Sequence, residues 1–389
     1  MFSTYAPSPL YGGPARLFWL RKVLERSGFV VHNIVANSSI ESTKLGPGDI
    51  RVRPVLRPGE RHHPLFEDVQ VGHRAAAQPR IVRAVRSQLA AIDPDIIWLE
   101  QPWLLPLVHA VGRSAKAKLV YSSQNMEREL KIILCGFYGG GKSSDKALVD
   151  EVGRVEREAA STADLVFSIC GADQAAMRRL FGVESVLLPN GSGLSGLVAD
   201  QRSKYRELFS GKHRYFGFAG SSYLPNQEGL AVLATPSLAF LPPDVRIAIA
   251  GSLGPALDHH RRFLRQWSVN IHRINRLGFL DDPDYAQFCL HLPCTIVPIF
   301  HGGGSNLKTA DALVTGSPVI ASRESMVGYE DILDIDPRNL TVVDTPGEFR
   351  AAMTENLQAR PVSPIVTERS RALSWSSRLA PVAAALDDL

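Results

Sequence analysis

The sequence predicts an α/β fold built from two Rossmann-like domains in series, each with a parallel sheet. Apolar strand-like runs alternate with amphipathic helical stretches along the chain, the pattern of β–α–β units. The strand-like runs are apolar on both faces, which is typical of parallel strands buried under helices. A length of 389 residues suits about two domains of ordinary size.

The first domain is expected to span residues 1–195. Its first clear helix is Arg16–Arg26, in which Leu17, Leu20, Val23 and Leu24 share one face and Gly28 follows as a C-terminal cap. Further helices are expected at Arg80–Ala91 and Lys146–Ala160. The predicted strands are Val30–Val35, Ile96–Leu99, Lys118–Tyr121, Leu165–Ile169 and Ser185–Leu188. Arg51–His63 is rich in Arg and Pro without periodicity, and it is predicted to be an exposed loop.

A boundary between the domains is predicted near the turn residues Pro189–Gly193, which precede a polar helix at Gln201–Phe209. The second domain is expected to span residues 205–362. The tail, about 365–389, is helical by pattern. The predicted strands of the second domain are Tyr215–Ala219, Arg246–Ala250, Ile274–Phe279, Thr295–Ile299 and Ser317–Ala321.

The composition excludes several classes of protein. Hydrophobic residues make up 45% of the chain and charged residues 21%, as in ordinary globular domains. The four cysteines form no Cys-x-x-Cys pair, so we expect reduced thiols in a cytoplasmic protein and no structural zinc. The N-terminus has no signal-peptide pattern, and apolar runs near six residues are too short to span a bilayer.

Three Asp-x-Asp triplets, at 93–95, 282–284 and 334–336, could in principle hold a divalent metal. Two of them contain proline, which favours a turn, so the sequence predicts neither a metal site nor a cofactor.

The charge is mildly asymmetric. The net formal charge is +4, and residues 1–190 hold 24 Lys and Arg against 19 Asp and Glu. Such an excess suits a phosphate or an anionic lipid head group, so peripheral contact with the inner membrane face is one prediction. Surface arginines without a ligand are the simpler interpretation. We expect no nucleic-acid partner.

The strongest motif is HGGGSNLKTADALVTGSPVIAS at 301–322. A predicted strand runs into three glycines and then into a helix that starts near Asn306. Glycines let backbone N–H groups approach an anion, and a helix N-terminus carries partial positive charge. Lys308 would add a full charge at a phosphate, and Asp311, one turn later, suits the hydroxyls of a ribose. The motif therefore predicts a phosphate-binding site.

Other motifs are weaker. Gly12 and Gly13 precede a helix and could approach a phosphate, while Glu100 and His301 each follow a predicted strand, at the edge that faces ligands in open α/β sheets. The segment GFYGGGKS at 136–143 matches the P-loop pattern through Lys142 and Ser143. Its position deep inside the first domain favours a glycine-rich loop instead.

These segments, taken in order, resemble a retaining family 4 glycosyltransferase of the GT-B fold over almost the whole chain. The resemblance rests on PSPLYGGPARLFWLRKVLERSGFVV, DPDIIWLEQP, KLVYSSQNMERE, the segment ending in VLLPNGSG, FAGSSYLPNQEGL, LGFLDDPDYAQF and PIFHGGGSNLKTADALVTGSPVIAS. It implies two Rossmann-like domains facing across a cleft, with the C-terminal helix packing back on the N-terminal domain. The implied donor is a nucleoside-diphosphate sugar, used without a metal.

The resemblance also implies roles for individual residues. Phe279 and Leu280 would flank the base, Lys308 would lie near the phosphates, and Asp311 takes the place of a ribose-binding glutamate. Two further departures are Gln124, where the family commonly has a histidine, and Gly303, where it commonly has a glutamate. The candidate catalytic residues are Gln124, Glu127 and His301. The candidate donor-binding residues are Gly12, Gly13, Ser221, Asn226, Phe279, Leu280, Gly302, Gly303, Gly304, Ser305, Asn306, Lys308 and Asp311.

The predicted function is transfer of a sugar, with retention, to a hydroxyl of a polysaccharide or a lipid-linked glycan. A non-catalytic binding or partner protein on the same fold is the main alternative. A P-loop phosphotransferase that uses Lys142 and a sugar epimerase on the GT-B fold are minor alternatives.

Overall fold

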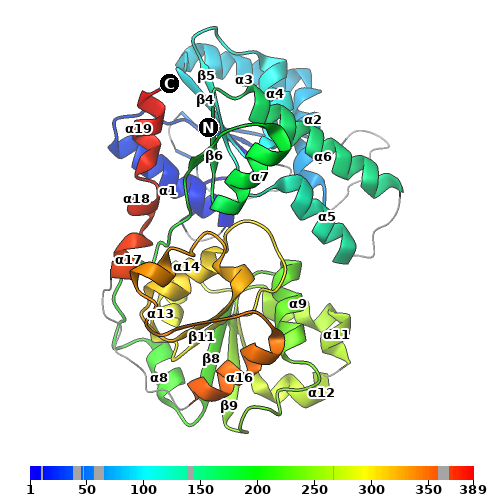
Figure 1. Ribbon diagram of the computed structural model, residues 1–389. Helices are drawn as coiled ribbons and strands as arrows, with labels where there is room; N and C mark the ends of the chain where they lie inside the picture. Colours follow the sequence, from blue (N-terminus) through cyan, green and yellow to red (C-terminus); the bar gives the residue numbers. More distant parts are fainter. Residues whose placement is uncertain are drawn as a thin grey trace. The chain divides into compact units, whose positions relative to one another are not determined.

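The computed structural model describes residues 1–9, 12–37, 45–46, 48–56, 65–137, 143–265, 267–357 and 368–389. The chain divides into two compact units (Figure 1). Unit 1 comprises Met1–Pro189 together with Leu379–Leu389, and unit 2 comprises Asn190–Arg378. The chain therefore leaves unit 1 after Pro189 and returns to it at Leu379.

Unit 1 contains a seven-stranded parallel sheet in the order β3-β2-β1-β4-β5-β6-β7. Because β2 and β3 lie on one side of β1 and β4 lies on the other, the strand order reverses between β1 and β4. This is the topological switch point at which open α/β sheets bind ligands. The strands are β1 (Phe2–Ser3), β2 (Ile34–Ala36), β3 (Ile50–Val52), β4 (Ile96–Glu100), β5 (Lys118–Ser122), β6 (Leu165–Ser168) and β7 (Val186–Leu187).

Helices cover both faces of this sheet (Figure 1). The predicted apolar face of α1 is confirmed for Leu17, Leu20 and Leu24, which are buried, whereas Val23 at its border is only partly buried. Gly28, just beyond the helix, has a positive φ of 92°, as its capping position requires. The helices are α1 (Gly12–Arg26), α2 (Glu67–Ala76), α3 (Pro79–Ile92), α4 (Leu105–Val111), α5 (Glu127–Phe137), α6 (Ser143–Thr162), α7 (Gly171–Phe181) and α19 (Pro381–Asp387), with a 3₁₀ turn at Pro102–Leu104.

Two local predictions in unit 1 are wrong. The segment Arg51–His63 is not all loop, because Arg51 and Val52 belong to β3 and Val52 is buried; residues 57–63 lie outside the described part. The strand predicted at Val30–Val35 begins only at Ile34, and Val30 is 84% exposed. Both errors arise where a strand has only three residues, too few for a periodic pattern.

Unit 2 contains a six-stranded parallel sheet in the order β10-β9-β8-β11-β12-β13. Its order reverses between β8 and β11, which defines a second switch point. The strands are β8 (Arg214–Ala219), β9 (Val245–Ala250), β10 (Ile274–Gly278), β11 (Thr295–Val297), β12 (Val319–Ser322) and β13 (Leu340–Val343).

The helices of unit 2 connect these strands and include several single turns. They are α8 (Lys204–Ser210), α9 (Leu224–Leu233), α10 (Leu253–Ala256), α11 (Arg261–Leu264), α12 (Trp267–Asn270), α13 (Asp282–His291), α14 (Leu307–Val314), α15 (Ile332–Ile335), α16 (Pro346–Asn356), α17 (Glu368–Ala372) and α18 (Trp375–Arg378), with 3₁₀ turns at Leu257–His259, Ile271–Arg273 and Arg323–Met326.

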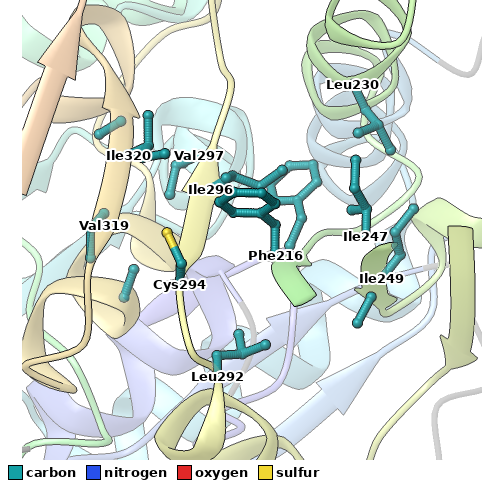
Figure 2. Packing of buried hydrophobic residues seen from close by; sticks show 14 of the residues in the cluster. Phe216, Leu230, Ile247, Ile249, Leu292, Cys294, Ile296, Val297, Val319 and Ile320 are labelled. Carbon is teal, nitrogen blue, oxygen red and sulfur yellow. The ribbon is translucent and has the colours of Figure 1, made fainter. Parts of the chain in front are cut away.

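The core of unit 2 is continuous across its central strands. Figure 2 shows Phe216 of β8 between Ile296 of β11 and Ile247 of β9, with Leu230 of α9 nearby. Burial of each such side chain contributes about 1.5–3 kcal/mol. The ends of β8 and β11, where the glycine motif begins, therefore rest on a packed core.

All four cysteines are buried and free. Within the described part of the chain, no helix combines the length and apolar character needed to cross a bilayer.

Candidate functional site

The switch point of unit 2 gathers most of the predicted donor-binding residues. Ser221 and Asn226 follow β8, and the segment His301–Asn306 follows β11 and leads into α14. Because β8 and β11 are neighbouring parallel strands, both segments leave the sheet at the same edge. Helix α9 packs closely on the end of β11, because a Cβ on Gly229 would lie 1.8 Å from the carbonyl oxygen of Pro298.

Ser221 and Asn226 form a closed turn after β8. The Nδ2 of Asn226 donates to the carbonyl oxygen of Ser221 at 3.0 Å, and the Asn226 side chain is buried. Asn226 therefore shapes the loop at this edge.

The N-terminus of α14 has no side-chain cap. Asn306 occupies the N-cap position with extended backbone, but its Oδ1 accepts from Nζ of Lys308 at 3.1 Å instead of capping a backbone amide. Gly304 has a positive φ of 63°, which turns the chain into the helix. Three glycines, an uncapped helix terminus and a lysine are therefore adjacent, and this combination suits an anion.

Asp311 lies one turn into α14 and is buried. Its Oδ1 accepts from Oγ of Ser192 at 2.6 Å, and its Oδ2 accepts from the hydroxyl of Tyr285 at 2.7 Å. Burial raises the pKa of Asp311 to about 6 and lowers the pKa of Lys308 to about 8, while the attraction between the two groups opposes both shifts.

Asn190 and Ser192 are site residues that the sequence reasoning missed. The Nδ2 of Asn190 donates to Oγ of Ser305 at 2.8 Å, and Ser192 holds Asp311 as described. Ser192 is fixed in turn, because its backbone N–H donates to the carbonyl oxygen of Leu373 at 2.7 Å. The sequence pattern of residues 189–193 indicates only a turn at a domain boundary, yet Asn190 and Ser192 also support the glycine motif.

The remaining candidates of unit 2 lie farther along its edge. Phe279 follows β10 and is 69% exposed, whereas Leu280 is 8% exposed and belongs to the core. The exposed side chain of Phe279 can therefore contact a base more readily than the buried side chain of Leu280. His301 is exposed just after β11, close enough to lower the pKa of Glu324, which burial raises.

In unit 1, the predicted residues also lie at a switch point. Gly12 and Gly13 begin α1, which follows β1, and Gln124 and Glu127 follow β5. Gly12 has a positive φ of 45°. A Cβ on Gly13 would lie 2.4 Å from the hydroxyl oxygen of Tyr5, so no larger residue fits there without displacing that ring.

Glu100, at the end of β4, does not offer a free carboxylate. Oε1 accepts from Nε of Arg16 at 3.1 Å and from Nε2 of Gln124 at 2.6 Å, and Oε2 accepts from Nε1 of Trp98 at 2.8 Å. The side chains of Arg16 and Glu100 are 1% and 0% exposed. The position of Glu100 suggests direct contact with a ligand, but its carboxylate instead holds the side chain of Gln124 in place.

Glu127 is buried at the first turn of α5. Burial raises its pKa to about 8, against the opposing effect of Lys131. Its backbone N–H and that of Arg128 donate to the carboxylate of Glu156 at 2.6 and 3.1 Å. Glu156 thus caps α5 and fixes the position of Glu127.

The other motifs do not form sites in the described structure. Gly141 and Lys142 of the P-loop match lie outside the described residues, but α5 precedes them and α6 follows, whereas a P-loop joins a strand to a helix. Among the described residues, no cluster of His, Cys, Asp and Glu could hold a metal ion. Members of all three Asp-x-Asp triplets pair with basic side chains instead: Lys116, Lys204 and Arg338.

Two parallel-sheet units, each with polar residues at its switch point, define the GT-B class of proteins. Solved structures of that fold match nearly the whole chain. A sucrose-phosphate synthase from Thermosynechococcus elongatus has a TM-score of 0.72 at 16% identity, over 99% of this chain and 95% of that one. WaaG, a glycosyltransferase involved in lipopolysaccharide biosynthesis, has a TM-score of 0.66 at 12% identity, over 100% of this chain and 98% of that one. HepE from Anabaena, solved with UDP and glucose, has a TM-score of 0.64 at 15% identity, over 100% of this chain and 99% of that one.

The family match is more specific than the fold. Residues 12–191 belong to the glycosyl transferase 4-like domain family. This part of the chain is thus a glycosyl transferase 4-like domain, and the chain as a whole has the GT-B fold, as the sequence resemblance predicted. No curated protein matches it.

Proposed function

We propose that this protein transfers a sugar from a nucleoside-diphosphate donor to a hydroxyl of a glycan or lipid-linked acceptor, with retention and without a metal. The observation that carries the proposal is the switch point of unit 2. There the uncapped N-terminus of α14, the three glycines and Lys308 lie next to the buried carboxyl of Asp311. The solved structures of HepE with UDP and with UDP-glucose support a nucleotide-sugar ligand on this fold.

The chemistry requires stabilisation of a departing diphosphate. The bond between the anomeric carbon and the phosphate oxygen breaks, and its electron pair leaves with the diphosphate. The acceptor oxygen bonds to the anomeric carbon, and its proton passes to the departing diphosphate oxygen. Backbone N–H groups and Lys308 would stabilise the charge that develops on the leaving oxygen. Because these donors already provide positive potential, we assign no metal to the step.

Asp311 is proposed to bind the ribose. Each of its oxygens already accepts one hydrogen bond, from Ser192 or Tyr285, and a carboxylate has further lone pairs for ribose hydroxyls. Phe279, exposed at the end of β10, is the proposed contact of the base. His301 and Glu127 remain the proposed catalytic contacts. At pH 7, a carboxyl with a pKa of about 8 is mostly protonated, so Glu127 would donate a hydrogen bond.

The acceptor and the cellular setting are also proposals. The excess of basic residues in residues 1–190 supports an acceptor that carries phosphate, such as a lipid-linked glycan, met at the inner face of the membrane by a cytoplasmic protein.

The proposal is tested by a thermal-shift screen with UDP, GDP, ADP and their sugar conjugates, each with and without Mg²⁺. A ligand that binds only the folded state raises the melting temperature. We expect one nucleoside diphosphate to stabilise the protein equally with and without the metal, and its sugar conjugate to be turned over. Binding without turnover would favour the non-catalytic alternative, and stabilisation only by Mg²⁺–ATP would contradict the proposal.

A further inference from the structure

The turn that follows β12 carries a carboxyl group that the proposed function does not use. Glu324 lies in the 3₁₀ turn Arg323–Met326, directly after β12. Because β12 and β11 are neighbouring parallel strands, their carboxyl ends meet at one edge of the sheet. Glu324 therefore lies at the edge of unit 2 from which the glycine motif emerges.

Hydrogen bonds fix this turn against the two segments that flank the glycine motif. The hydroxyl of Ser322, at the end of β12, donates to the carbonyl oxygen of Ile299 just after β11. On the other side, the hydroxyl of Thr309 in α14 donates to the carbonyl oxygen of Ser325 at 2.8 Å. Thr309 and Ser325 are both fully buried. The backbone on either side of Glu324 is thus held in place.

The side chain of Glu324, by contrast, has no internal partner. It is half-buried, and in the described part of the chain no hydrogen bond or ion pair uses its carboxyl group. The preceding residue, Arg323, pairs with Asp344 instead. Burial raises the pKa of Glu324 and the charge of His301 lowers it, so the imidazole lies close to the carboxyl group. A half-buried carboxylate with unused lone pairs is stabilised by a ligand that supplies donors.

The charge of Glu324 determines which part of a donor it can contact. The diphosphate is proposed to bind at the N-terminus of α14 near Lys308, and a carboxylate would repel it. The sugar must lie next to the diphosphate, because the anomeric carbon is bonded to it. Sugar hydroxyls donate hydrogen bonds, and a carboxylate can accept from two neighbouring hydroxyls at once. The sugar is therefore the part of the donor that Glu324 suits.

We infer that Glu324 binds hydroxyls of the donor sugar and excludes sugars that carry a carboxylate of their own. Two carboxylates that share a half-buried site repel each other, so the same group that binds a neutral sugar rejects an acidic one. The donor is thus the conjugate of a neutral sugar and not of a uronic acid. This inference rests on the proposed function and names the substrate class of the same site.

The binding of two sugar conjugates that differ by one carboxylate tests this role. Calorimetry compares UDP, UDP-glucose and UDP-glucuronic acid in the wild-type protein, in Glu324→Gln and in Glu330→Gln. Glutamine keeps the shape of the side chain and removes its charge. Glu330 is the matched control, because it is exposed in the connection after the same turn and its Oε2 already accepts from the backbone N–H of Gly328 at 2.8 Å.

We expect the wild type and the control to bind UDP-glucose at least tenfold more tightly than UDP-glucuronic acid. In Glu324→Gln the affinity for UDP should stay unchanged, the affinity for UDP-glucose should fall about tenfold, and the preference for the neutral sugar should disappear. The unchanged affinity for UDP shows that the variant is folded. A preference that persists in Glu324→Gln would overturn the inference and leave the proposed function intact.

Glucose 1-phosphate and glucuronic acid 1-phosphate extend the comparison to a donor with a different base, because they carry only the sugar and a phosphate. The same preference in the wild type and the same loss in Glu324→Gln are expected. If the wild type binds no nucleoside diphosphate at all, the proposed function fails and the inference fails with it.

Denaturant unfolding of the free protein is a separate check on Glu324. Since its carboxylate has no partner among the described residues, Glu324→Gln should not lower the free energy of unfolding. A loss of stability would show that the carboxylate serves the fold, and this result would also overturn the inference.

Discussion

At Lys308 and Asp311, burial favours the neutral form of the side chain, whereas the proposed function uses the charged form. Both lie on α14, and burial shifts both pKa values toward the neutral form. A bound diphosphate would reverse the shift at Lys308, because a nearby anion stabilises the charged ammonium. The free protein therefore holds a lysine that is less stable charged than it would be in water.

Replacing this lysine should weaken nucleotide binding and stabilise the free protein. The lowered pKa means that charging Lys308 costs folding free energy at every pH below about 8, and the cost disappears as pH rises through the unfolded value of 10.5. Lys308→Met should therefore raise the melting temperature at pH 7. It should also weaken nucleoside-diphosphate binding at least tenfold, as measured by calorimetry. An unchanged affinity would remove Lys308 from the site.

The same pKa predicts a proton-linked affinity. Below about pH 8 the ammonium is already charged, and above it the free protein must take up a proton to bind the anion. The affinity of the wild-type protein for the nucleoside diphosphate should thus fall as the pH rises above 8. Calorimetry in two buffers of different ionisation enthalpy should show proton uptake near pH 8 that Lys308→Met lacks.

Among the elements, two helices approach the switch points through a glycine. In unit 2, Gly229 of α9 meets the carbonyl oxygen of Pro298 after β11. In unit 1, Gly72 of α2 meets the carbonyl oxygen of Trp103 after β4, where a Cβ would lie 1.7 Å away. In each unit, the missing side chain lets a helix backbone fix the segment that follows the strand at the switch point.

Gly229→Ala should displace α9 from the segment that leads into the glycine motif. A Cβ so close to a backbone oxygen requires a shift of the backbone, which costs about 1–3 kcal/mol. Gly136→Ala is the matched control, because Gly136 in α5 has open space around it and alanine favours a helix by about 0.5–1 kcal/mol. Denaturant unfolding should show a lower free energy of unfolding for Gly229→Ala and no decrease for Gly136→Ala. Equal stability of the two would refute the contact.

The elements also show which parts of the fold a sequence can predict. The helix Arg16–Arg26 and the strands of four or more buried residues have enough repeats to produce a pattern. The short strands β1 and β3 do not, and β13, which the sequence pattern does not reveal, has only one buried residue, Val343. The glycine motif of the site was visible because its residues are contiguous. The hydrogen bonds of Ser192 to Asp311 and of Gln124 to Glu100 join residues far apart in sequence, and no local pattern reveals them.

At the scale of the whole molecule, two leucines near the C-terminus belong to different units. Leu373 and Leu379 are both fully buried, yet Leu373 lies in unit 2 and Leu379 in unit 1. The chain returns to unit 1 after the five residues that separate these two leucines.

Leu379→Ala and Leu373→Ala should therefore destabilise different halves of the protein. A buried leucine replaced by alanine costs about 2–5 kcal/mol. In Leu379→Ala, the amides of unit 1 should lose protection from hydrogen exchange while unit 2 still binds the nucleotide. In Leu373→Ala, the amides of unit 2 should lose protection. The same pattern of lost protection in both variants would contradict the division of the chain at Leu379.

The return of the chain at Leu379 has a consequence for synthesis on the ribosome. Met1–Pro189 are made before unit 2, but Leu379, Val382 and Leu386, which are buried and belong to unit 1, are made after it. Unit 2 can complete its core as soon as Arg378 emerges from the ribosome. Until Leu379–Leu389 follow, the part of unit 1 that they cover stays exposed to solvent. During translation, unit 1 thus begins to be synthesised before unit 2 but finishes folding after it.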